Sequence, residues 1–457
     1  MFNLFKPKLP IELSSKAWIE FRWRWLGEHV GWDLMRDTST LTLEDFPELE
    51  DLTDESAHRI FERIASQFRI SCSTVRIRLV SDDEMPKLPS GESLALGLYC
   101  LPEGSDPAAT ISISKLLLDE PPLLVATIAH ELAHHLLLSG PDPLCGADEH
   151  DHEFLTDLVL VFAGLGLFVA NCTVSEHFER DGDSFSYRIS RQGYLSSLQA
   201  GYALGLQTWM RGDHSPAWLR QLRPDAREPC QKTIRYLVKT KDALVQPSVY
   251  STKAERLRVP INISLLSPTQ RLAQLLEWDD DGAPIESILV HLNRLLADPV
   301  SEIRIEALIS LRDLHAPINP DSVNDLVRCL SSSNSTESSL ACAILLKNQY
   351  KETEELLSFS LYWFNDNRET LLARDTFCEA IKSLDAEQFL PKYQQAIVAK
   401  VDRDLRTGEQ EAEDLLEVLQ LVPDIEAILT DFFSHWSAER QQGLVDFRET
   451  GERPIQL

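Results

Sequence analysis

The sequence lacks a long uninterrupted hydrophobic run. Its longest lipid-like stretch, from Leu158 to Ala170, has thirteen residues, which is short of the ~20 that a membrane-spanning helix needs. The first eighteen residues contain lysines and prolines but not the continuous apolar core of a signal peptide. We therefore expect neither a membrane span nor secretion.

Basic residues are also scarce. Lysine and arginine number 44 against 72 aspartates and glutamates, which gives a formal net charge of −28 and a sequence pI of about 4.8. A chain with this balance repels phosphate backbones and anionic lipid surfaces. The composition therefore predicts no nucleic-acid partner and no membrane partner.

Cysteine is sparse and scattered. There are eight cysteines in 457 residues, none of them in a Cys-x-x-Cys pair, and several fall within apolar helical patterns. Reduced, buried thiols have this distribution, whereas small secreted domains have dense cysteines joined as disulfides. We therefore expect a cytoplasmic location.

The first half of the chain has the pattern of an α+β domain. Amphipathic helices are predicted over residues 16–32 and 55–68, and strand-like runs follow at Thr74–Val80, Leu94–Cys100 and Ala109–Ile113. We interpret residues 1–245 as one domain, with a helical segment (1–70), a small sheet (73–113), two site-bearing helices (121–171) and further helices (190–240).

Residues 246–271 lose the periodic pattern and contain three prolines, so we expect a linker there. Residues 272–457 are almost entirely helical in pattern. An offset of 34 residues pairs apolar or small residues across two polar turns: Leu292 with Leu326, Leu296 with Leu330, Ala307 with Ala341 and Leu311 with Leu345. The segment resembles a HEAT-type helical repeat, and a generic helical bundle is the alternative.

The motif AHELAHH, residues 129–135, is the clearest chemical signal. It lies in a predicted helix that begins near Asp119 or Glu120, with prolines in its first turn, and ends at Gly140-Pro141. Residues four apart share one face of a helix, so the rings of His130 and His134 can reach one cation. Glu131 flanks that point, and His135 is expected to be a bystander.

A catalytic zinc ion needs a third protein ligand and keeps one position for water. Glu153 and Asp157, four residues apart in the next predicted helix, place two carboxylates on one face. We predict that Glu153 completes the ligand set. Asp157 is predicted to accept a hydrogen bond from a ligand histidine and so select its tautomer.

The pattern His130-Glu131-x-x-His134, followed after eighteen residues by Glu153-x-x-x-Asp157, resembles the gluzincin metallopeptidases, which include thermolysin-like and Ste24-like groups. The segment HELAHH is also similar to the corresponding motif of the ImmA/IrrE-type peptidases. The pattern does not specify which of these peptidase groups the chain resembles most. The resemblance covers about 28 residues. It implies a zincin-like domain in which His130, His134 and Glu153 bind Zn²⁺ and Glu131 acts as general base.

Other polar residues near the motif have competing interpretations. Such peptidases add a donor for the oxyanion, and the candidates are Tyr194, Tyr202 and His214, although the tyrosines also fit helix packing. Six residues of the intervening loop could replace Glu153 as a ligand: Cys145, Asp148, Glu149, His150, Asp151 and His152. We expect the two histidines to be solvated loop residues, with Asp151 capping the second helix.

These observations leave two hypotheses of different classes. The first is a cytoplasmic zinc metallopeptidase that cleaves a protein or peptide substrate and recruits a protein partner through its helical-repeat domain. The second is a non-catalytic scaffold or regulator with a structural zinc site, which would need four protein ligands. A degenerate peptidase is a weaker third reading, because Glu131 is present.

Overall fold

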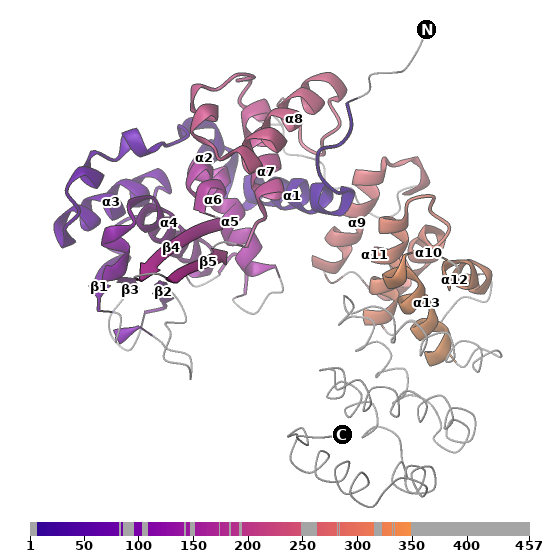
Figure 1. Ribbon diagram of the computed structural model, residues 1–457. Coiled ribbons are helices and arrows are strands. Elements are labelled where there is room, and N and C mark those ends of the chain that lie inside the picture. Colours follow the sequence, from indigo (N-terminus) through magenta and orange to yellow (C-terminus); the bar gives the residue numbers. More distant parts are fainter. Residues whose placement is uncertain are drawn as a thin grey trace, which may run out of the picture. The chain divides into compact units, whose positions relative to one another are not determined.

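The computed structural model divides into two compact units, Met1–Arg258 and Val259–Leu457 (Figure 1). It describes residues 7–348, apart from short stretches at 82–83, 86–95, 103–107, 141–142, 147–150, 173, 182–183, 192–193, 248–262, 281, 283, 315–321, 331 and 333. The greater part of the expected linker and residues 349–457 of the expected repeat domain therefore lie outside the described residues.

The described chain is mostly helical, with a three-stranded sheet and a two-stranded hairpin that both belong to the first unit. This is the coarse form of the predicted α+β region followed by a helical region. No helix among the described residues is long and apolar enough to cross a membrane.

The expected helix over residues 16–32 is interrupted. Helix α1 runs over Leu13–Leu26, a π-helical turn (η1) covers Gly27–Gly31, and α2 continues over Trp32–Asp37. The π-helical turn begins at Gly27, which lies against the Trp32 ring. A Cβ atom at this position would be 2.1 Å from that ring, so the close contact requires glycine. Helix α3, Asp54–Gln67, follows the expectation for residues 55–68 and begins with a capping box at Thr53.

The three expected strands form one mixed sheet. Strands β1 (Val75–Val80), β2 (Gly97–Cys100) and β3 (Ala109–Ser114) lie in the order β1-β3-β2. β1 pairs parallel to β3, and β2 pairs antiparallel to it. β2 is therefore an edge strand whose outer side has no partner strand among the described residues.

Two site-bearing helices follow the sheet. Helix α4 runs over Pro121–Leu138, but the expected second helix is split into α5 (His152–Phe162) and α6 (Gly166–Cys172). The break lies at Gly164, whose φ of +92° is readily adopted only by glycine. A Cβ atom at this position would also lie 2.2 Å from the Ser39 carbonyl oxygen.

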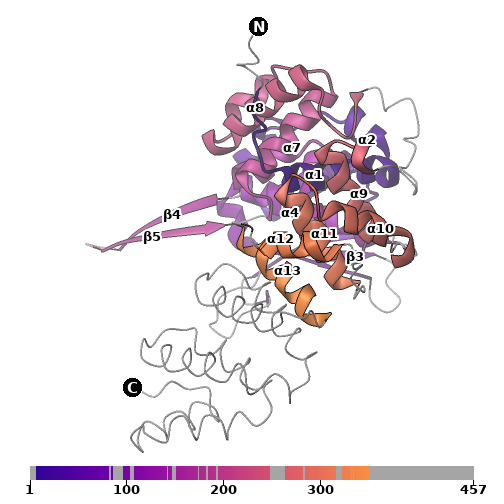
Figure 2. The same ribbon diagram turned by 90° about the vertical axis from the view of Figure 1, so that its right-hand side faces the viewer.

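A hairpin that we did not predict follows α6. Strands β4 (Val174–Asp181) and β5 (Ser184–Arg191) pair antiparallel, and Figure 2 shows them projecting from the first unit. The sequence contains part of the signal, because Gly-Asp separates the two strands and Phe, Tyr and Ile alternate with polar residues in the second. The expected helix over 190–211 therefore begins later, as α7 at Ser197–Met210.

The first unit is completed by η6 (Ala217–Gln221) and α8 (Pro224–Thr240), where the sequence predicted a single helix over 215–240. One apolar core joins α1, α3, the sheet, α4 to α8 and their connections. Its largest fully buried side chains include Trp23 and Phe162, which pack edge to face with ring centroids 5.1 Å apart. This core holds α4 and α5 side by side.

The described part of the second unit consists of helices alone: α9 (Pro268–Asp280), α10 (Ile285–Leu295), α11 (Ser301–Asp313), α12 (Val323–Leu330) and α13 (Ser335–Lys347). α11 and α13 begin 34 residues apart and end 34 residues apart. Of the paired positions, Leu330 is half-buried and the other seven are buried. The Arg304 guanidinium joins α11 to Glu337 of α13 with an Nε to Oε1 distance of 2.5 Å.

Candidate metal centre

Helix α4 carries the two histidines of the motif on one face. Glu120 stands at the N-cap and prolines occupy its first turn. Leu124, Ile128 and Leu132 are fully buried and anchor the helix in the core. This leaves the His130 ring partly exposed and the His134 ring just buried, both near α5.

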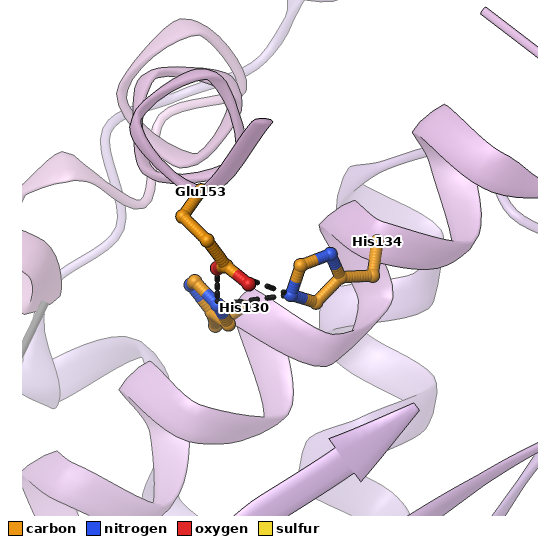
Figure 3. A group of neighbouring side chains, drawn as sticks. All are labelled: His130, His134 and Glu153. Carbon is orange, nitrogen blue, oxygen red and sulfur yellow. Dashed lines mark hydrogen bonds and ion pairs between the residues drawn. The ribbon is translucent and has the colours of Figure 1, made fainter. Parts of the chain in front are cut away.

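Helix α5 brings Glu153 to the same place. Its carboxylate oxygen Oε2 lies 3.2 Å from Nε2 of His130 and 3.5 Å from Nε2 of His134, and the two nitrogens are 3.1 Å apart. Figure 3 shows the three side chains converging from two helices. Among the described residues they form a group able to hold a metal ion, with three members.

The three atoms have the spacing of zinc ligands. Zinc bonds of 2.0–2.1 Å in tetrahedral geometry separate neighbouring ligand atoms by ~3.3 Å, and the three observed separations lie within about 0.2 Å of that value. One carboxylate with two imidazoles is also a ligand set that catalytic zinc sites use. The residues therefore fit a zinc ion.

Asp157 selects the tautomer of His130. Its Oδ1 accepts from His130 Nδ1 at 3.1 Å, while its Oδ2 accepts from the backbone N–H groups of Tyr194 and Leu195 at 2.7 and 3.0 Å. A proton on Nδ1 leaves a lone pair on Nε2 of His130, the nitrogen that faces Glu153. The position expected for Asp157 on the basis of helix spacing is the one the structure has.

His152 contacts and orients His134. The sequence did not predict this role. We expected a solvated loop residue, but His152 is the first residue of α5 and is buried. Its Nε2 lies 2.9 Å from Nδ1 of His134, and its Nδ1 lies 3.5 Å from Sγ of Cys145. If each Nδ1 carries the proton, His134 also presents a lone pair at Nε2. The only available signal was that His152 directly precedes Glu153.

The centre attracts positive charge. Burial by itself lowers the pKa of His130, but hydrogen bonds to Asp157 and Glu153 outweigh it and raise that pKa to about 10. Burial would raise the pKa of Glu153, yet hydrogen bonds from His130 and His134 hold it well below its usual range. Two lone pairs and a carboxylate oxygen within 3.5 Å of one another repel unless a proton or a cation lies among them.

The side chain of Glu131, a residue of α4, lies against the edge strand β2. Its carboxyl group accepts a hydrogen bond from the backbone N–H of Tyr99. A Cβ atom on Gly97 would lie 2.6 Å from Oε1 of Glu131 and 2.6 Å from Cγ2 of Thr127, so glycine permits this close approach of strand and helix. Burial raises the pKa of Glu131 to about 7, and the nearby His130 opposes that rise.

Of the three oxyanion-donor candidates, Tyr194 lies at the centre. Its ring stacks against His130 with centroids 6.0 Å apart, and burial together with Glu153 raises its pKa. Tyr202 is fully buried and donates to Oε1 of Glu20 at 2.6 Å, so it is a packing residue. His214 is exposed in the turn after α7.

The remaining loop candidates have other positions. Asp151 stands at the N-cap of α5 but makes no cap hydrogen bond; its side chain accepts from Trp18 Nε1 at 2.8 Å and Arg22 Nε at 2.7 Å. His135 is held by Thr74 and by the Tyr99 hydroxyl, at 3.0 and 3.2 Å. Asp148, Glu149 and His150 lie outside the described residues.

Comparisons of this chain with models of protein families, with curated proteins and with solved structures find no match. Support for a function therefore comes from the residues of the centre and their geometry. Three features matter most: the triangle of ligand atoms, the two histidine partners behind it and the buried carboxyl group of Glu131 beside it.

Proposed function

We propose that this protein is a zinc-dependent peptidase of the gluzincin type, which hydrolyses peptide bonds of a protein or peptide substrate. The observation that carries the proposal is the triangle of His130 Nε2, His134 Nε2 and Glu153 Oε2, with sides of 3.1 to 3.5 Å. Glu131 follows His130 directly in the same helix and is buried. The proposed ligands and the proposed base are thus residues of the motif and of the helix that follows it.

In this proposal the triad holds Zn²⁺, which acidifies a water molecule and polarises the substrate carbonyl when bound. Glu131 accepts a proton from the attacking water through its carboxylate and passes it to the nitrogen of the leaving amine as the C–N bond breaks. Its raised pKa, about 7, suits a group that accepts and returns a proton near neutral pH. With the metal bound, Asp157 and His152 would hold the protons of His130 and His134 at Nδ1, so that the Nε2 nitrogens face the metal.

Tyr194 is the proposed donor to the oxyanion. Burial and the carboxylates around it raise the pKa of its phenol further above neutral pH, so the hydroxyl remains a hydrogen-bond donor. The ring position beside His130 is set by the two backbone bonds to Asp157. The same carboxylate would therefore align a ligand and an oxyanion donor.

The edge strand β2 is the proposed binding place of the substrate backbone. β2 pairs on one side with β3, and α4 lies close enough that Glu131 contacts Gly97 and Tyr99. An extended peptide that adds to the outer edge would pass beside the general base.

For the second unit we propose a HEAT-like repeat that recruits or orients a protein substrate. The matching bounds of α11 and α13, and the burial of the paired residues, support a repeated helix hairpin. The cytoplasmic location expected from the cysteines belongs to the same proposal.

A structural zinc site in a scaffold protein fits the centre less well. Such a site needs four protein ligands, whereas the described ligand group has three. Cys145 and His152, the expected substitutes, lie behind His134 at its Nδ1 side and not at the ligand triangle. Within the described part of the chain no fourth ligand completes the triangle, which favours hydrolysis.

The test separates metal binding from proton transfer. We expect the purified full chain to bind one zinc per molecule and His134→Ala to bind none, while the neighbouring His135→Ala still binds zinc. Glu131→Gln should bind zinc normally and lose hydrolysis of a proteome-derived peptide library by several orders of magnitude, since only the base is removed. Normal cleavage by Glu131→Gln would refute the mechanism, and the trapped substrate could be identified by mass spectrometry.

A further inference from the structure

A row of aromatic rings leads from the metal centre to the N-terminal helix. The Tyr194 ring stacks on His130, with centroids 6.0 Å apart and planes at 18°. Phe154 meets Tyr194 at 6.1 Å, and Trp18 meets Phe154 at 6.1 Å, both edge to face. The rings come from α4, the segment before α7, α5 and α1, so the row exists only in the folded chain.

The middle of the row faces solvent. The exposed fraction is 36% for Phe154 and 45% for Tyr194, and Trp18 is half-buried. Single exposed apolar side chains are common, but contiguous exposed aromatic rings are typical of binding sites. Here they begin at a residue of the candidate metal centre.

The row is held in place before any ligand arrives. Trp18 donates from Nε1 to Asp151, which also binds Arg22, and the backbone of Tyr194 is bound by Asp157. The Trp18 ring and the backbone of Tyr194 are therefore held in place. A preformed apolar surface orders few groups on binding, so it contributes more of its contact energy to affinity.

We propose that Trp18, Phe154 and Tyr194 form a specificity subsite, which takes a bulky apolar side chain of the substrate, aromatic or leucine-like, within two residues of the scissile bond. The inference rests on the proposed peptidase function and names its substrate preference. An extended peptide advances ~3.3 Å per residue, so a row that starts at the ring of His130 is reached from residues adjacent to the hydrolysed bond. Edge-to-face contact with Phe154 favours an aromatic ring.

The test measures binding as well as cleavage. The probes are peptide hydroxamates whose hydroxamate binds zinc and whose one variable side chain is benzyl, methyl or that of arginine, placed on either side of the zinc-binding group. Affinities are measured by calorimetry on the zinc-loaded full chain. The variants are Phe154→Ala, Phe154→Leu and the control Leu116→Ala, a 55% exposed leucine in η5 (Lys115–Asp119). Zinc stoichiometry is determined for each, because Phe154 adjoins Glu153.

We expect the wild-type chain to bind the benzyl probe at least ~10-fold more tightly than the methyl probe in one of the two placements. Phe154→Ala should reduce that ratio to within about threefold, Phe154→Leu should keep most of it, and Leu116→Ala should leave it unchanged. A wild-type ratio near one, an unchanged ratio in Phe154→Ala or tighter binding of the arginine probe would overturn the subsite.

The two proposals fail in different ways. If the chain binds the benzyl probe through Phe154 but hydrolyses no peptide, the subsite is supported and the peptidase function is refuted. If wild type and Phe154→Ala both hydrolyse peptides without preference for bulky apolar residues near the cleaved bond, the peptidase function is supported and the subsite is refuted. If the chain binds no zinc, both proposals are refuted.

Discussion

Substitution of Asp157 by asparagine should weaken zinc binding although Asp157 does not face the ligand triangle. The carboxylate accepts three hydrogen bonds, one from Nδ1 of His130 and two from the backbone N–H groups of Tyr194 and Leu195. Asparagine offers one oxygen and one NH₂ group. It can satisfy the backbone pair only by turning its NH₂ group toward His130.

The tautomer of His130 then changes. A donor opposite Nδ1 requires a lone pair there, so the proton moves to Nε2, the nitrogen that lies 3.2 Å from Oε2 of Glu153. In the wild type zinc also displaces a proton from the ring, but Asp157 then holds the remaining proton at Nδ1 and its negative charge stabilises the zinc-bound ring. In the variant the NH₂ group opposes a proton at Nδ1, and the negative charge behind the ring is absent. We expect zinc affinity to fall 10- to 100-fold, or about 1.4–2.8 kcal/mol. The alternative rotamer sets NH₂ against two backbone donors, at a cost of about 1–3 kcal/mol for each unsatisfied group.

The assay is competition for zinc with a chromophoric chelator, together with urea unfolding. The control is Asp298→Asn, which removes a carboxylate with 7% exposed side chain from its ion pair with Arg271 in the second unit. It should destabilise the protein and leave zinc affinity unchanged. Zinc affinity of Asp157→Asn within threefold of wild type would refute the tautomer argument.

Three further outcomes are expected. His152→Ala should weaken zinc binding about 10-fold, because His134 loses its hydrogen-bond partner. The control His135→Ala removes a buried histidine next to His134 in α4 and should leave zinc binding unchanged. Equal effects of the two substitutions in the chelator assay would contradict this prediction. Below the raised pKa of His130, about 10, the metal-free ring carries a proton that zinc displaces, so zinc affinity should increase as the pH rises toward that value. Calorimetry in buffers of different ionisation enthalpy should count about one proton released per zinc near pH 7, and zero would be the wrong result. Tyr202→Phe should cost about 1–3 kcal/mol of stability in urea unfolding, because Glu20 loses a buried donor, with cleavage unchanged if Tyr202 only packs.

Regular elements with strong periodicity were predictable from the sequence. The helix over residues 55–68 corresponds to α3, and the three strand-like runs correspond to β1, β2 and β3. The missed features depend on single residues that override a pattern: Gly164 splits a continuous apolar run into α5 and α6. The β4–β5 hairpin was missed although Gly-Asp stands between its strands in the sequence, because alternation confined to one of the two runs carries less signal than helical spacing.

Within the centre, spacing along a helix placed pairs of residues but not their partners. His130 and His134 share a face of α4, and Glu153 and Asp157 share a face of α5. The positions of His152 and Asp151 did not follow from the pattern. Both side chains were assigned to loop or capping roles, and both instead contact residues of other elements, His134 and Trp18.

The sequence by itself determined what lies within one helical turn: two imidazoles on one face, two carboxylates on another, and the apolar stripes that bury the opposite sides. The 3.6-residue repeat is a local property of the backbone, so spacing alone specifies it. Only the tertiary structure decided that α5 meets α4 with Oε2 of Glu153 3.2 Å from His130, that β2 lies against Glu131 and that an aromatic row reaches α1. Those distances result from the packing of the whole core, in which residues far apart in the chain determine one another's positions.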